Sequence, residues 1–192
     1  MTASKTTNLS KRTARLTVTA MFTALIIAGG AISVPIPISP SPVSMTSMFV
    51  LLAGLVLGWK YGMVSVALYI LLGAAGQPVF SGFTGGFGVL ASLRGGFILS
   101  FLPAAALVGL VTKRRGNNFW VTLAAVTVGT LLIIVSGVTW ARFHPLGMPS
   151  WSAAIGAMAL PFLPGDALKI VIIMLLSKTL LPRLSAAEHF GA

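Results

Sequence analysis

The stretch WVTLAAVTVGTLLIIVSGVTW, residues 120–140, carries no charged side chain and begins and ends with tryptophan. A helix needs about 20 consecutive apolar residues to cross the hydrocarbon core of a bilayer, and tryptophan is enriched at both interfaces of the membrane. The whole chain shares this character, with 56% hydrophobic residues, 8% charged residues and a mean hydropathy of +0.99. We therefore predict an all-α membrane protein.

Working outward from this stretch, similar apolar segments fill most of the chain. They cover residues 16–33, 44–57, 63–75 and 97–111, and a last span is broken at Pro161 and Pro164 into residues 152–160 and 164–181. We expect a bundle of six transmembrane helices over residues 15–182, with a cytoplasmic N-terminal tail at 1–14 and a cytoplasmic C-terminal tail at 183–192. Two connections are unusual: a proline-rich segment at 34–42, which cannot form a regular helix, and a glycine-rich loop at 77–96.

The lysines and arginines indicate how the bundle lies in the membrane. With the N-terminus inside, ten of them fall on the cytoplasmic side and three on the external side, namely Arg94, Arg142 and Lys169. This asymmetry favours cytoplasmic termini in a multi-pass protein of the cell membrane. It also accounts for the net charge of +11 without a nucleic-acid partner, because the basic residues lie in short clusters between apolar segments.

Signatures of catalysis and of metal or nucleotide binding are missing from the sequence. The chain has no cysteine and two histidines, which argues against a metal site. It has no nucleophile elbow, no His-Glu-x-x-His and no phosphate-binding loop. We expect no catalytic residues and no cofactor, and the energy for any uphill transport would have to come from elsewhere.

Asp166 is the outstanding polar residue, because it begins the last long apolar segment and the only other acid, Glu188, lies in the polar tail. An ionisable group at the edge of the hydrocarbon is costly and usually functional. Lys169 lies three residues later, on the same face of a helix, so we predict that the two form a polar binding site. The alternative is that Asp166 only stabilises a helix N-terminus, although Lys169 would be unfavourable there.

Ala20, Ala24 and Ala28 form a stripe of small residues along one face of the first span. Such stripes let another helix approach closely. Both packing within the bundle and docking of a partner subunit fit this pattern.

In this order, the motifs resemble those of the BioY family, the biotin-binding S components of energy-coupling-factor (ECF) vitamin transporters. The resemblance rests on the alanine stripe, Pro35-Ile36-Pro37 with Pro40-Ser41-Pro42, Leu51 to Gly58 with Gly62, Leu71-Leu72-Gly73 through Gly76-Gln77-Pro78-Val79-Phe80, and Leu160 to Asp166 with Lys169. It implies a vitamin pocket near the external surface, a first helix that docks on a transmembrane coupling subunit, and ATP hydrolysis by separate ATP-binding subunits. The ligand it implies is biotin.

The resemblance also implies ligand contacts for Asp166 and Lys169, with Thr84 as a third polar position. We expect Phe80 and Phe83 to supply apolar cover and Arg94 to meet the biotin carboxylate. Two departures touch the expected pocket wall: Ser92-Leu93-Arg94-Gly95-Gly96-Phe97 replaces the usual Gly-Pro-Thr-Gly-Gly-Tyr, and Thr46 replaces a usual glutamine. The alternatives are an S component for another vitamin or heterocycle, a carrier that works without the ATPase module, and an intramembrane enzyme.

Overall fold

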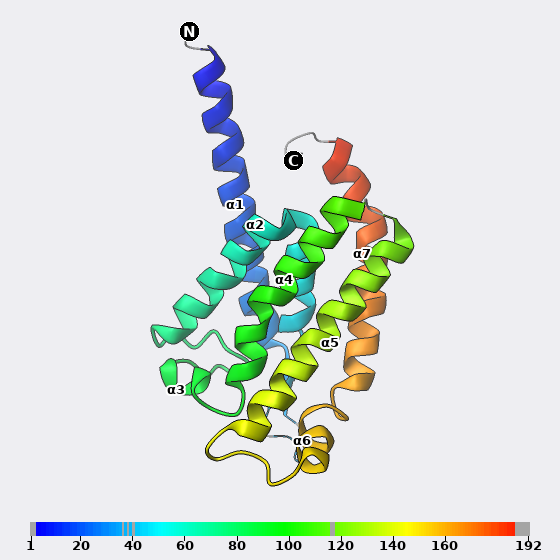
Figure 1. The fold of residues 1–192 in the computed structure, drawn as a ribbon. Coiled ribbons are helices and arrows are strands. Elements are labelled where there is room, and N and C mark those ends of the chain that lie inside the picture. The colour runs from blue at the N-terminus through cyan, green and yellow to red at the C-terminus, as the bar shows by residue number, and fades with distance from the viewer. Residues whose placement is uncertain (1–2, 36, 38, 40, 116–117, 187–192) are drawn as a thin grey trace.

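The computed structural model describes residues 3–35, 37, 39, 41–115 and 118–186. Long helices dominate it: α1 (Ala3–Ala31), α2 (Thr46–Ala74), α4 (Gly95–Arg115), α5 (Phe119–Phe143) and α7 (Leu163–Ala186). Two short helices, α3 (Phe87–Leu90) and α6 (Trp151–Met158), both lie at one end of the bundle, while α1 begins and α7 ends at the other (Figure 1).

Two of the predicted spans lie in α2, as two helical segments that meet at a kink. The backbone leaves helical geometry at Gly58, where φ is 73° and ψ is 177°, a conformation that costs glycine little because it has no Cβ. The predicted connection between residues 57 and 63 is therefore a sharp kink, and α2 has one limb on each side of it.

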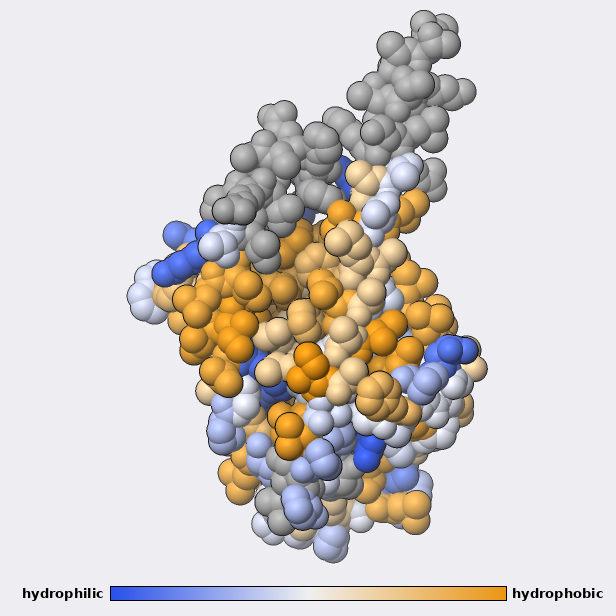
Figure 2. Space-filling model, turned by 180° about the vertical axis from the view of Figure 1, so that it is seen from behind, coloured by the Kyte–Doolittle hydropathy of each residue, from blue (hydrophilic) through white to orange (hydrophobic). Residues whose placement is uncertain are grey.

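The membrane-spanning character of the bundle follows from its helices. Among the described residues, α1, α2, α4 and α5 are each long and apolar enough to cross a bilayer, and α6 with α7 forms a fifth candidate bent by 49°. The bend coincides with the predicted break at Pro161, which lies between the two helices. Large apolar side chains such as Leu71, Val135 and Leu175 are exposed, and hydrophobic residues cover the middle of the face shown in Figure 2.

The fold departs from a purely helical one at the proline-rich segment. Ser33–Val34 (β1) and Val43–Ser44 (β2) pair as two short antiparallel strands. The prolines between them cannot continue a helix, so the chain turns back and brings the start of α2 against the end of α1. This small sheet was not predicted.

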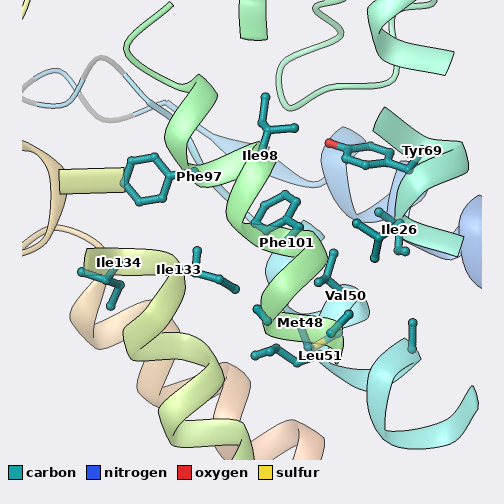
Figure 3. Packing of buried hydrophobic residues seen from close by; sticks show 14 of the residues in the cluster. Ile26, Met48, Val50, Leu51, Tyr69, Phe97, Ile98, Phe101, Ile133 and Ile134 are labelled. Atoms are coloured by element: carbon teal, nitrogen blue, oxygen red, sulfur yellow. The ribbon is translucent and has the colours of Figure 1, made fainter. Parts of the chain in front are cut away.

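The core lies where α2, α4 and α5 pack together. Gly54 on α2 faces the backbone of Ala105 on α4 so closely that a side chain at this position would collide with it. Small residues of this kind let membrane helices approach each other closely. Figure 3 shows the side chains that fill the space between these helices and α1.

Candidate functional site

A cavity lies at the end of the bundle that carries α3 and α6. Its walls come from α2, α4, α5 and α7, together with the proline-rich segment and the glycine-rich loop. Five of the six predicted binding residues line it, namely Asp166, Lys169, Thr84, Arg94 and Phe80. The tertiary structure therefore brings these five residues, which are spread over positions 80 to 169 of the sequence, around one cavity.

Asp166 and Lys169 form a buried ion pair in the cavity wall. Lys169 Nζ lies 2.8 Å from Asp166 Oδ1 and donates a second hydrogen bond to Ser47 Oγ at 3.1 Å. The two residues are only 8% and 6% exposed. Among the described residues, the Asp166 carboxylate bonds to Lys169 and to no backbone N–H. It lies in the first turn of α7, where a negative charge is also favourable.

Aromatic and aliphatic side chains form much of the remaining wall. Phe97 on α4 stacks on Phe162, with ring centroids 5.7 Å apart, and Phe80 packs edge-on against Tyr69 at 5.4 Å. Figure 3 shows Phe97 and Phe101 projecting from α4 and Ile133 and Ile134 from α5. An apolar ring system with few polar atoms would fit against such a wall.

A chain of hydroxyl groups forms a polar strip on the α2 side. Ser81 Oγ donates to Ser44 Oγ at 2.9 Å, and Ser44 Oγ donates to Thr46 Oγ1 at 3.1 Å. Ser44, Ser47, Tyr69 and Ser81 line the cavity, and none of them was predicted, because isolated serines and tyrosines carry no sequence signal of their own.

The glycine-rich loop turns tightly at the cavity. Phe80 and Thr84 pair through both backbone hydrogen bonds, at 2.9 and 3.3 Å, and Thr84 Oγ1 donates to Ser81 O at 3.1 Å. Phe83, at the tip, has a positive φ of 55° and is 70% exposed. It is not among the residues that line the cavity.

Arg94 lies in a turn that α5 holds in place. Trp140 Nε1 donates to Ser92 O at 2.9 Å, and His144 Nε2 lies 2.6 Å from Ala91 O. The N–H of Leu146 donates to His144 Nδ1 at 3.1 Å, so Nε2 carries the proton and donates to Ala91. Trp140 and His144 are one helical turn apart, and sequence reasoning found neither of them.

The predicted alanine stripe faces away from the bundle. Ala20, Ala24 and Ala28 are all exposed, whereas Thr19, Thr23 and Ile26 on the same helix are buried. Thr23 Oγ1 bonds to Ser65 Oγ at 3.1 Å and so ties α1 to the second limb of α2. The face of α1 that packs within the bundle is therefore the one that carries Thr19, Thr23 and Ile26.

Comparison with known proteins agrees with this architecture. Residues 2–186 match the model of the BioY family. The chain is 38% identical to the biotin transporter BioY of Thermotoga maritima, over 82% of this chain and 89% of that protein. It is 33% identical to the biotin transporter BioY of Rhizobium etli, over 86% and 92% of the two chains.

A solved structure extends the similarity to three dimensions. It is the crystal structure of the S component for biotin from an ECF-type ABC transporter, which superposes with a TM-score of 0.82 over 95% of both chains at 28% identity. The family model spans nearly the whole sequence, and the relatives align with this chain over most of their length. This chain therefore belongs to the BioY family.

Proposed function

We infer that this protein binds biotin and takes part in its uptake across the membrane. The observation that carries the inference is the buried Asp166–Lys169 pair in the wall of a largely apolar cavity, in a chain whose relatives are named biotin transporters. The relatives are transporters and not enzymes, in keeping with the missing catalytic motifs.

Each part of biotin has a partner of suitable chemistry in this cavity. The ureido group offers N–H donors to Asp166, whose carboxylate can accept about four hydrogen bonds. Lys169 uses one donor for Asp166 and one for Ser47, and a third N–H is left for a ligand acceptor. Phe80, Phe97 and Phe162 cover the thioether ring, Thr84 adds a hydroxyl, and Arg94 meets the carboxylate.

Binding of biotin requires the cavity to widen. Its volume is about 60 Å³, below the roughly 300–1,000 Å³ of typical small-molecule pockets. Packed helices resist such a change, whereas the proline-rich segment and the glycine-rich loop are irregular walls joined by the hydrogen bond between Ser44 and Ser81. We propose that these two segments separate to admit the ligand.

The membrane arrangement that we propose has six spans, with each limb of α2 counted as one. It places both termini in the cytoplasm and the cavity near the external surface of the cell membrane. The basic residues support it, because Lys60 and Lys113 to Arg115 lie toward the end where α7 ends, while Arg94 and Arg142 lie toward the other.

We also propose that the chain works as the S component of an ECF transporter. The exposed Ala20, Ala24 and Ala28 would face the transmembrane coupling subunit, since small residues allow close helix contact within the bilayer. ATP-binding subunits would supply the energy, because this sequence contains no phosphate-binding loop.

Identification of the ligand retained after gentle purification tests the function directly. Native mass spectrometry of the detergent-solubilised protein should show a bound mass equal to that of biotin, which added desthiobiotin displaces. A different retained vitamin would contradict the assignment. Uptake by the chain alone, in a host without coupling subunits, would instead favour a carrier independent of the ATPase module.

A further inference from the structure

A second hollow, which we call the kink pocket, lies at the end of the bundle away from the biotin cavity. It has a volume of about 490 Å³ and is formed by Arg15 on α1, residues 55–61 around the α2 kink, and Gly109, Thr112 and Lys113 on α4. Figure 1 shows the kink of α2 beside the C-terminal end of α4, at the end where α7 also terminates. Nothing in the binding of biotin uses it.

Close backbone contacts surround the kink beside this hollow. Gly109 of α4 lies directly against the backbone of Gly58 and Trp59, where a side chain would collide. Gly62 packs on Gly54 in the same way, since an added Cβ would lie 2.9 Å from the Gly54 Cα. The two limbs of α2 therefore pack closely on each other and on α4, and the hollow lies beside these contacts.

Three basic side chains, Arg15, Lys60 and Lys113, line the kink pocket. Within the described residues, Lys60 and Lys113 form no ion pair with a carboxylate, and the one described acid, Asp166, is bound to Lys169 in the biotin cavity. Cations gathered around a hollow attract an anion, and none of the described residues that line this one is acidic.

Aromatic rings orient two of these cations at the depth of the membrane interface. The Arg15 guanidinium lies 5.8 Å from the centre of the Tyr61 ring, and Lys60 Nζ lies 5.4 Å from that of Trp59. Tryptophan and tyrosine favour the level of lipid headgroups. A ligand held by these cations would therefore sit where phospholipid phosphates lie.

The pocket also has an apolar side, formed by Leu55, Val56 and Leu57. Free phosphate would leave these side chains unused. An anionic phospholipid would use both parts, with its phosphate on the cations and its glycerol and first methylene groups against the leucines and valine. Basic pockets between membrane helices bind such headgroups in other proteins.

We propose that the kink pocket is a binding site for the phosphate headgroup of an anionic phospholipid. The probe is an equimolar mixture of phosphatidylglycerol and phosphatidylcholine with the same acyl chains, added to the delipidated full chain in detergent. Native mass spectrometry measures the ratio of the two lipids that remain bound. The wild-type protein should retain phosphatidylglycerol in clear excess.

A pair of double variants separates the pocket from the general charge of this surface. Lys60→Gln with Lys113→Gln removes two lining cations, while Arg114→Gln with Arg115→Gln removes two exposed cations that do not line the pocket. A basic side chain near an anionic headgroup contributes about fivefold to binding. The preference for phosphatidylglycerol should therefore fall about 25-fold in the first variant and stay within about twofold in the second.

Three outcomes would overturn the proposal. Equal retention of both lipids by the wild type shows that there is no headgroup site, and equal losses in the two double variants assign the preference to surface charge. Complete displacement of phosphatidylglycerol by millimolar sodium phosphate makes a soluble anion the occupant. Biotin binding, measured on the same samples, should be unchanged in both variants.

Discussion

Replacement of Asp166 by alanine should weaken biotin binding by roughly one and a half to four powers of ten. Loss of one partner from a desolvated, hydrogen-bonded charge pair costs about 2–5 kcal/mol, and each factor of ten in Kd corresponds to about 1.4 kcal/mol. Asp166 is 8% exposed and its partner Lys169 is 6% exposed, so water screens neither group well. Isothermal titration calorimetry of the detergent-solubilised protein measures the change.

Part of this loss comes from Lys169, because its ammonium would remain buried without its carboxylate partner. Such an orphaned charge destabilises the folded protein by about 3–5 kcal/mol, so the thermal unfolding of ligand-free variants must be recorded beside their affinities. Asp166→Asn keeps an acceptor oxygen and should lose less affinity than Asp166→Ala. Lys169→Ala should also weaken binding, whereas Lys178→Ala is its matched control, an exposed lysine of the same helix that lies outside the cavity.

A folded Asp166→Ala protein with the affinity of the wild type would refute the role of this carboxylate in binding. An equal loss of affinity in Lys178→Ala would show that the titration reports the general charge of α7 and not a contact with the ligand. The expected order of affinity is wild type and Lys178→Ala, then Asp166→Asn, then Asp166→Ala.

Three further predictions address the mouth of the cavity, its opening and the partner face. Arg94→Gln should weaken biotin binding roughly tenfold to hundredfold, as expected for the loss of a hydrogen bond to a charged group. The affinity for biotinamide, which lacks the carboxylate, should stay unchanged, and equal losses for both ligands would contradict the contact between Arg94 and the carboxylate. In this cysteine-free chain, Ser44→Cys with Ser81→Cys should form a disulfide, because the two hydroxyl oxygens are 2.9 Å apart. The oxidised protein should bind biotin much more slowly than the reduced one in stopped-flow fluorescence, and equal rates would show that these segments need not separate. Ala24→Trp should prevent copurification with the coupling subunit while biotin affinity is retained, since Ala24 is exposed. The matched change Val128→Trp, at an exposed position of α5, should leave copurification intact.

The hydropathy of the sequence was enough to predict the membrane helices, the break near Pro161 and the polar pair at the head of the last helix. These features are local: a span depends on the composition of about 20 consecutive residues, and residues three apart on a helix are neighbours wherever the helix lies. The pairing of Asp166 with Lys169 was predictable for this reason. Whether Phe83 points toward the cavity or away from it was not predictable, because this direction depends on one positive φ in a glycine-rich loop.

Only the tertiary structure decided which other groups share the cavity with that pair. Ser47 reaches Lys169 across 122 positions of sequence, Trp140 reaches Ser92 across 48 and Ser81 reaches Ser44 across 37. No periodicity in a single sequence encodes contacts between residues so far apart along the chain. These contacts arise from the way in which α2, α4, α5 and α7 pack against one another. The sequence by itself determined that this protein is a helical membrane protein with a buried acid. The packing of the helices decided which side chains surround that acid, because residues far apart in the sequence come into contact only when the helices pack together.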